Sequence, residues 1–425
     1  MGAVGAAHRP AVTVASGPVR FSPPVHVAVV GIGADGWSGV PERLRSVVLD
    51  AEVLLGGDQH LDLVPDVDRQ EREAWPHPLR DGLPAVLRRH AGRRVVALAA
   101  GDPFLSGIGT TLVDLLGAES VTVEPTTSSV ALARARMGWS AESTTVVPVA
   151  GRDPHVVLRH LAPGHRLVVL SPDAATPELL AGLLVMAGYG GSAMTVLGDL
   201  GGERECRVDT TAADWSGRGP DLPVVALELA GPVVGSWAPG LPDEHFENDG
   251  RLTRRDLRAS ALARLAPQPG QLLWDVGAGA GSIGIEWMRA HPSCRAVAVE
   301  VDPGRAARVG RNAVALGVPD LEVVTGHAPE VLVRLPKPDA VFVGGGATAA
   351  GLLSYCLRSL RPGGRLVVQG TTLETEQALA AAYARSGGEL TRLSVEQAAP
   401  SGASTGWTPA RTITQWSVSK ELARG

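Results

Sequence analysis

Residues Leu272–Pro303 read LLWDVGAGAGSIGIEWMRAHPSCRAVAVEVDP, and this stretch decides the fold class. An apolar run ends in Asp275, a glycine-rich turn follows, helical spacing resumes, and a second apolar run ends in Glu300. The pattern predicts a strand, a glycine turn, a helix and a second strand, with a carboxylate where the ribose of a bound nucleoside would sit. We therefore expect an α/β domain with a doubly wound, mostly parallel sheet.

Length and composition set the outer limits. A chain of 425 residues is too long for one core, so two or three domains are expected. The net charge of −5 argues against a nucleic-acid binder, which needs a basic face. The cysteines are isolated, which favours neither a zinc site nor a disulfide framework and fits a reducing cytoplasm. No window has the apolar length of a membrane span, and residues 1–24 are interpreted as a disordered leader.

The first domain is predicted to begin at Val25 with the strand and turn VHVAVVGIGADG. Gly31, Gly33 and Gly36 satisfy the GxGxxG spacing of a dinucleotide site. Such a site would next need an acid at the end of the second strand, but AEVLLGG ends in glycines instead. NAD binding is therefore disfavoured here, and a plain strand-to-helix turn remains an open interpretation.

Two further loops of this domain carry polar residues. In RRVVALAAGDPFLSGIGTTLVDLL, Gly101, Asp102 and Pro103 place a carboxylate at the carboxyl end of a strand, where α/β sheets bind ligands. In VTVEPTTSSVALARARMG, Ser128 and Ser129 open a helix, where hydroxyls usually act as caps. The pattern then becomes β-rich, which predicts an internal hinge between about residues 124 and 146.

These motifs, with LSPDAATP and VLGDLGGERE after them, resemble the tetrapyrrole (corrin/porphyrin) methylase family over about residues 25–229. Within that family, the motifs resemble most specifically the branch that methylates C5 of a corrin precursor. It implies two α/β lobes with S-adenosylmethionine (SAM) in the cleft between them. The cofactor contacts that it implies lie at Gly31, Gly33 and Gly101–Pro103, to which we add Ser128 and Ser129, and Asp102 is also expected to make a polar contact in the reaction.

The stretch 231–250 is rich in proline, glycine and acids, which predicts a linker. In the helix expected after it, RLTRRDLRASALARLAP, Thr253 is predicted to cap and Asp256 to complete a capping box. Arg254 and Arg258 lie four residues apart and so share one side of that helix. Either they are a solvated face or they grip a carboxylate of the substrate, and we carry the second interpretation as a hypothesis.

The ligand of the opening stretch follows from its charges. Asp275 precedes the glycines of the turn, Gly277, Gly279 and Gly281. A carboxylate there would repel a pyrophosphate, whereas it suits the ammonium group of SAM. Glu300 would accept hydrogen bonds from both ribose hydroxyls. The turn therefore favours SAM over NAD.

Further motifs give a second resemblance. LPDEHF, LTRRDLR, DVGAGAGSIGIE, TGHAPEVL and FVGGG resemble the cobalamin-pathway methyltransferases that act at C15 and remove the acetate carboxyl at C12, over about residues 241–420. The resemblance implies a Rossmann-like class I methyltransferase fold and self-association. It also implies an adenine pocket at His327 and Ala328, Gly344 beside the transferred methyl, and a cofactor contact at Thr253.

Together the resemblances imply a tetrapyrrole methylase domain over 25–230 and a class I domain over 251–425. The implied enzyme is bifunctional: it uses two SAM molecules and no metal, methylates C5 and C15 of precorrin-6B and decarboxylates the C12 acetate to give precorrin-8X. A methyltransferase acting on another tetrapyrrole, an NAD-dependent oxidoreductase and a non-catalytic tetrapyrrole carrier are the alternatives.

Overall fold

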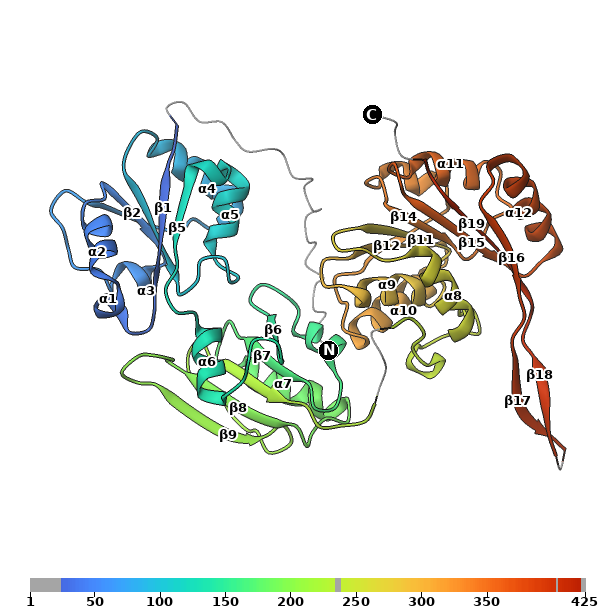
Figure 1. Ribbon diagram of the computed structural model, residues 1–425, viewed down its shortest axis with the longest axis horizontal. Helices are drawn as coiled ribbons and strands as arrows, with labels where there is room; N and C mark the ends of the chain where they lie inside the picture. The colour runs from blue at the N-terminus through green and yellow to red at the C-terminus, as the bar shows by residue number, and fades with distance from the viewer. Residues whose placement is uncertain (1–23, 234–237, 403, 422–425) are drawn as a thin grey trace, which may run out of the picture. The chain divides into compact units, whose positions relative to one another are not determined.

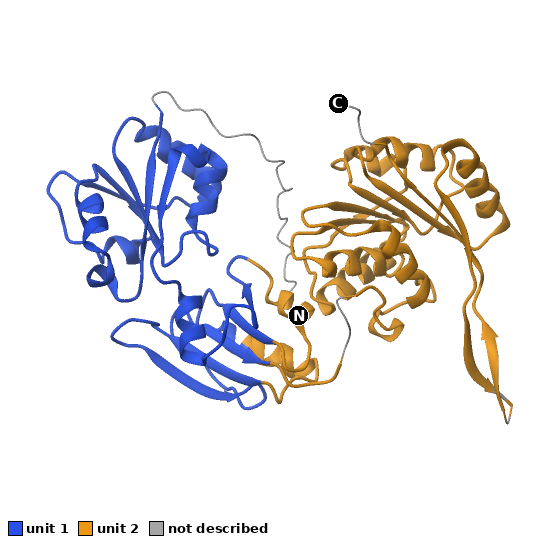
Figure 2. Cartoon of the chain, in the orientation of Figure 1, with its two compact units in different colours: residues 1–151, 166–178, 193–228 blue, residues 152–165, 179–192, 229–425 orange. Residues whose placement is uncertain are grey.

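A computed structural model describes residues 24–233, 238–402 and 404–421 of the chain. The chain divides into two compact units (Figure 2). Unit 1 holds the described residues up to Gly151 together with Arg166–Glu178 and Ala193–Glu228, and unit 2 holds the rest. Segments 152–165 and 179–192 thus pack with unit 2, although the predicted domain boundary lies at residue 230. The predicted leader, except for residue 24, lies outside the described residues.

The first sheet of unit 1 is parallel, with strand order β3-β2-β4-β1-β5. Helices cover both faces, which explains why its central strands are continuous apolar runs. The helices α4 and α5 pack on one face, and α2 and α3 on the other (Figure 1). The bounds are β1 Val27–Ile32, α1 Gly36–Gly39, α2 Glu42–Leu49, β2 Val53–Gly56, α3 Asp58–Leu61, β3 Glu71–Ala74, α4 Leu79–Arg89, β4 Val95–Ala100, α5 Ile108–Leu116, η1 Ala118–Ser120 and β5 Val121–Glu124.

The second sheet of unit 1 has the order β6-β7-β10-β8-β9, and only its β6–β7 pair is parallel. The chain leaves β5 at Glu124 and enters β6 at Thr144, which agrees with the predicted hinge. Helix α6 packs against the sheet through Val130 and Ala133. The bounds are α6 Ser129–Met137, β6 Thr144–Pro148, η2 Pro154–His160, β7 Arg166–Leu170, α7 Thr176–Met186, β8 Ala193–Gly198, β9 Cys206–Thr211 and β10 Val224–Glu228.

Unit 2 is built on a sheet of order β13-β12-β11-β14-β15-β19-β16, parallel except for the pairs made by β19. The helices α8, α9 and α10 pack on one face, and α11 and α12 on the other. The strand–turn–helix–strand prediction for 272–303 is confirmed as β11, α9 and β12, and the predicted α/β fold class is confirmed for both units. The bounds are η3 Asp243–His245, α8 Arg255–Leu265, β11 Leu272–Val276, α9 Ser282–Ala290, β12 Arg295–Glu300, α10 Pro303–Ala315, β13 Glu322–Thr325, η4 Glu330–Arg334, β14 Ala340–Val343, α11 Leu352–Ser359, β15 Arg365–Gly370, α12 Leu373–Ser386, β16 Glu389–Leu393, β17 Glu396–Ser401, β18 Ser404–Pro409 and β19 Ile413–Ser419.

The segment 240–251, which includes the end of the predicted linker 231–250, is packed into unit 2. Leu241 and Phe246 are each 3% exposed and belong to the core on the α8–α9–α10 face. The backbone N–H groups of Gly240 and Leu241 donate to the carboxylate of Glu286 at 2.6 and 3.0 Å. Two buried apolar side chains are too few to produce a periodic pattern in the sequence, so the composition of this stretch predicted an unpacked linker.

None of the helices in the described part of the chain combines the length and the apolar character needed to cross a membrane.

Candidate cofactor and substrate sites

Unit 1 contains a cavity of about 770 Å³, a size typical of small-molecule sites. The carboxyl ends of β1 and β4 and the helix α3 form one wall, and residues of α6, β7, β8 and β10 form the other. Five of the predicted cofactor residues line it, namely Gly33, Gly101, Asp102, Ser128 and Ser129. The structure thus brings together residues that lie almost a hundred positions apart in the sequence.

Gly31 and Pro103 do not line the cavity but shape its wall. A Cβ on Gly31 would lie 2.0 Å from the carbonyl oxygen of Gly101, so only glycine lets β1 approach the loop after β4 this closely. Pro103 is buried, and its carbonyl oxygen accepts from the N–H of Gly109 at 3.0 Å. Both residues therefore hold the loop in place, and their predicted contacts with the cofactor stay predictions.

Two polar groups in this cavity are fixed by the backbone. Asp102 is half-buried, and its Oδ1 accepts from the N–H of Phe104 at 2.9 Å. Ser128 is the N-cap of α6, and its Oγ accepts from the N–H of Ala131 at 3.2 Å, as a cap should. The Ser128 hydroxyl still has its own proton to donate to a ligand.

Sequence reasoning missed several polar residues that line the same cavity. They come from loops that are far apart in the chain and carry no motif: Gln59, His60, Asp199, Arg204, Cys206 and Asp221. The only sequence signal was the position of Gln59 and His60 directly after the second strand, where ligand-binding side chains often lie.

In unit 2 the glycine turn follows β11 as predicted. Gly277 has a left-handed φ of +72°, and a Cβ there would lie 2.8 Å from the backbone nitrogen of Gly345. Because β11 and β14 are neighbours, their carboxyl ends meet at this point, where the N–H of Gly344 donates to the carbonyl of Val276 at 2.9 Å. Gly281 is the N-cap of α9, and Gly279 also has a positive φ.

Asp275 is 1% exposed at the end of β11. Its Oδ2 accepts from the N–H of Gly284 at 2.9 Å, whereas its buried Oδ1 has no hydrogen-bond partner among the described residues. Burial, assisted by the negative charge of Glu300, raises the pKa of the Asp275 carboxyl to about 7. A buried acceptor without a partner is costly, so this oxygen fits the ammonium group of the expected cofactor.

Glu300 is 5% exposed at the end of β12. Its Oε2 accepts from the N–H of Gly279 at 2.8 Å, and its Oε1 accepts from the N–H of Asp302 at 3.1 Å. Each carboxylate oxygen can accept a second hydrogen bond, so the group can still take the two hydroxyls of a ribose. The glycine turn is thereby tied directly to the residue expected to hold the ribose.

Three predicted contacts lie at the same edge of the sheet. His327 is exposed and Ala328 half-buried, and both follow β13. Gly344 is exposed and follows β14. Their positions suit the adenine and methyl ends of a bound SAM, and their roles stay predictions.

Arg258 corrects the sequence hypothesis. Its side chain is 0% exposed, and its guanidinium donates to Glu286 at 2.5 Å, to Asp243 at 3.1 Å, and to the carbonyls of Thr253 and Leu241. A guanidinium that is fully buried and already donates to four internal acceptors is not accessible to a substrate carboxylate. The expectation that Arg258 grips the substrate is therefore wrong.

The start of α8 also differs from the prediction. Arg254, not Thr253, is the N-cap, it has no side-chain capping bond, and the predicted capping box with Asp256 does not form. The physical reason is that the Thr253 carbonyl is turned to the buried Arg258. Arg254 and Arg258 both pair with Asp243, at 3.5 and 3.1 Å, but the side chain of Arg254 is 61% exposed whereas that of Arg258 is buried. Arg254 remains available to a substrate.

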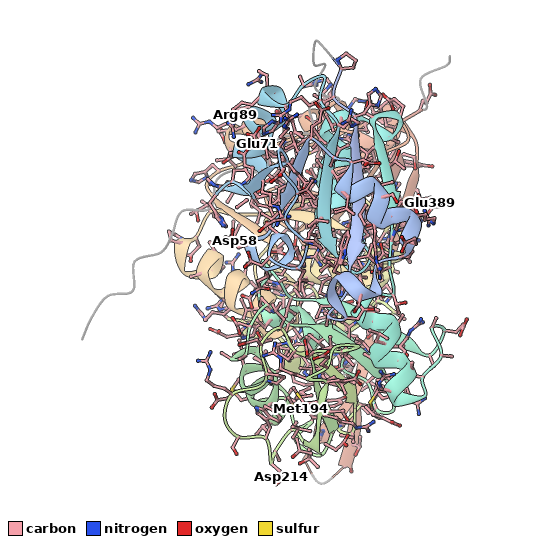
Figure 3. All side chains as sticks on the ribbon, turned by 90° about the vertical axis from the view of Figure 1, so that its left-hand side faces the viewer. Asp58, Glu71, Arg89, Met194, Asp214 and Glu389 are labelled. Carbon is pink, nitrogen blue, oxygen red and sulfur yellow. The ribbon has the colours of Figure 1, made fainter. Side chains whose placement is uncertain are left out.

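A cluster in unit 1 has metal-binding geometry, namely Glu71, Glu73 and His90. Arg93 donates to Glu71 at 2.5 Å, Arg89 pairs with Glu73, and His90 lies 2.7 Å from Glu73 (Figure 3 labels Glu71 and Arg89). The carboxylates are thus held by arginines, and the cluster is an ion-pair network at the β3–α4 edge.

Each of the two α/β units has a carboxylate at the carboxyl end of a parallel strand beside a glycine-containing loop, which is the arrangement expected of a SAM-dependent methyltransferase. The model of the tetrapyrrole (corrin/porphyrin) methylases matches residues 26–215, and the model of the precorrin methyltransferase domain matches residues 244–420.

The chain is 43% identical over 398 residues to a precorrin-6Y C(5,15)-methyltransferase [decarboxylating] of Sinorhizobium sp, covering 93% of this chain and 96% of that protein. It is 45% identical over 399 residues to the protein of that name from Mycobacterium tuberculosis (strain CDC 1551 / Oshkosh), covering 93% and 100%. The crystal structure of the C-terminal domain of precorrin-6Y C5,15-methyltransferase from Rhodobacter capsulatus is 40% identical and covers 44% of this chain and 100% of that one, with a TM-score of 0.42. The chain belongs to the precorrin-6Y C(5,15)-methyltransferase (decarboxylating) family, which confirms both resemblances read from the motifs.

Proposed function

We propose that this chain is a bifunctional SAM-dependent C-methyltransferase of cobalamin biosynthesis. It methylates C5 and C15 of precorrin-6B and removes the carboxyl of the C12 acetate to give precorrin-8X. The observation that carries the proposal is the match to relatives of this name along both units, over 93% of the chain. The two α/β units supply one cofactor site each, so two SAM molecules are used per substrate.

The bound cofactor supplies an electrophilic methyl group on a sulfonium. Methyl transfer is an in-line displacement, so the protein mainly has to align the reactants and exclude water. In unit 2, Asp275 would hold the ammonium end of the cofactor and Glu300 its ribose, both from buried positions. In unit 1 the other cofactor molecule would be held between the Asp102 loop on one wall of the cavity and the N-terminus of α6 on the opposite wall.

Decarboxylation needs a substrate whose other carboxylates are held while the departing one is poorly solvated. Arg254 is the candidate for holding one of them in unit 2, because its guanidinium is exposed beside the start of α8. The electrons left by the departing carboxyl enter the conjugated macrocycle, so no metal is part of the proposal. We further propose a cytoplasmic homo-oligomer that binds no nucleic acid, in keeping with the net charge of −5.

The test incubates the purified chain with methyl-labelled SAM and precorrin-6B and counts methyl groups and carbon dioxide. We expect two methyls and one carbon dioxide per macrocycle. Zero methyl transfer to an intact precursor would contradict the proposal.

A second arm tests the separate sites. Glu300→Ala removes the ribose acceptor of unit 2 and should abolish C15 methylation while C5 methylation stays measurable. Loss of both methylations from a folded variant would show that the sites are not independent.

A further inference from the structure

We propose that His60 donates a hydrogen bond from Nε2 to a carboxylate of the tetrapyrrole in the unit 1 cavity. The proposal rests on the proposed function, and it assigns a substrate contact to a residue outside every motif discussed above. His60 lies in α3, directly after β2, and lines the 770 Å³ cavity.

The placement of the ring decides which nitrogen is available. His60 Nδ1 is buried and has no hydrogen-bond partner among the described residues. It faces the backbone of Gly57, since a Cβ on that glycine would lie 3.6 Å from it. The imidazole thus presents Nε2 as the nitrogen left for a ligand.

The protonation state follows from the same burial. Desolvation lowers the pKa of the His60 imidazole, so the ring is neutral at neutral pH and carries one proton. A proton on Nδ1 would be a buried N–H without an acceptor, which is the costlier arrangement. The proton therefore belongs on Nε2, and His60 is a hydrogen-bond donor toward the cavity rather than a base.

The charges of the cavity explain why a donor is needed there. Its lining includes the acids Asp102, Asp199 and Asp221, which suit a sulfonium but repel the carboxylates of a tetrapyrrole. Arg204 is the cationic residue of the lining, and its side chain is 91% exposed and lies 3.8 Å from Asp199. A neutral N–H donor can bind a substrate carboxylate, and before the substrate arrives it forms no ion pair with these acids.

A carboxylate in this cavity has two sources, the substrate and the amino-acid tail of the cofactor. Strand β4 lies between β1 and β2 in the sheet, so the Asp102 loop separates His60 from the turn at Gly33. His60 therefore stands on the far side of the Asp102 loop from the predicted cofactor turn, which favours the substrate. The experiment below separates the two sources.

The test compares three variants of the full chain. His60→Leu removes the donor, His60→Gln retains an amide N–H close to the position of Nε2, and His60→Asn retains one only near the position of Nδ1. Steady-state kinetics of C5 methylation are measured by varying precorrin-6B and SAM in turn. Thermal unfolding and C15 methylation in the same chain serve as controls for folding.

We expect His60→Leu and His60→Asn to raise the KM for precorrin-6B in the C5 step on the order of 10- to 100-fold, as for loss of a hydrogen bond to a charged group. His60→Gln should recover most of that loss, and the KM for SAM should stay within about twofold of wild type in all three variants.

Three outcomes would overturn the proposal. A matching rise in the KM for SAM would place His60 on the cofactor tail, a fall in kcat with unchanged KM would make it a transition-state group, and unchanged C5 kinetics would remove it from the site. A wild-type chain that leaves C5 unmethylated refutes the proposed function itself, and the His60 assignment falls with it.

Discussion

Replacing Arg258 by methionine should destabilise unit 2 severely, because the guanidinium neutralises a buried carboxylate. Glu286 is 6% exposed, and without Arg258 its charge would be left with the N–H groups of Gly240 and Leu241. Breaking a buried ion pair by removing one partner costs about 3–5 kcal/mol. That is a large share of the stability of a typical domain, about 5–15 kcal/mol.

The assay is hydrogen exchange of the full chain in increasing urea, followed by mass spectrometry of peptides from α8 and α9. This readout assigns the loss to unit 2 even where the two units unfold separately. Arg254→Met is the matched control, because the side chain of that arginine is 61% exposed and its ion pair with Asp243 is long, at 3.5 Å. We expect the control to change the free energy of unfolding by no more than about 0.5 kcal/mol.

A double variant sharpens the reasoning. Arg258→Met combined with Glu286→Gln removes both charges, so part of the loss should be recovered, because no uncompensated ion then remains in the core. The reasoning is refuted if Arg258→Met unfolds within about 1 kcal/mol of wild type. It is equally refuted if the variant keeps full stability but loses affinity for precorrin-6B, since Arg258 would then be the substrate contact that the sequence suggested.

Other perturbations test the cofactor site of unit 2. The pKa of the Asp275 carboxyl is raised to about 7 in the folded state. This group therefore stabilises the fold below pH 4, and its contribution is lost as pH rises through 7. Asp275→Asn should flatten the dependence of the unfolding free energy on pH over this range. Gly277→Ala should abolish SAM binding to unit 2 in calorimetry, because its Cβ would lie 2.8 Å from the nitrogen of Gly345. Asn312→Leu should cost about 1–3 kcal/mol in urea unfolding, because Asn312 bonds both the N–H and the carbonyl of Glu247. It should also weaken SAM binding, because the Asn312 amide donates to the carbonyl of Ala280 in the glycine turn at 2.9 Å. Unchanged binding in either of the last two variants would contradict the assignment of the glycine turn.

The sequence was a good guide wherever the signal was local. The apolar strand, the glycine turn and the acid of the next strand lie within 32 consecutive residues, and each is placed by backbone geometry that those residues alone determine. Asp102 at the end of β4 and the cap at Ser128 are local in the same sense. These elements came out where they were predicted.

The predictions that were wrong, and the site residues that the sequence missed, all depend on contacts between residues far apart in the chain. Arg258 is buried because Glu286 lies 28 positions on and Asp243 lies 15 positions back, and helical spacing cannot distinguish that from a solvated face. His60 carries no motif, and it reaches the cavity because β2 adjoins β4. The sequence could not show that His60 lines a cavity, because the opposite wall of that cavity comes from the second sheet of unit 1.

The buried arginine connects the segment 240–251 to the cofactor turn. Through Asp243 and the carbonyl of Leu241, Arg258 holds the start of this segment against α8. Its far end reaches the turn itself, since a Cβ on Gly279 would lie 2.7 Å from the carbonyl oxygen of Arg251. The predicted SAM-binding turn is thus packed against a segment that is anchored by the ion pairs of Arg258 with Asp243 and Glu286. Arg258, which the sequence suggested as a substrate contact, instead holds the backbone of the segment that packs against the glycine turn.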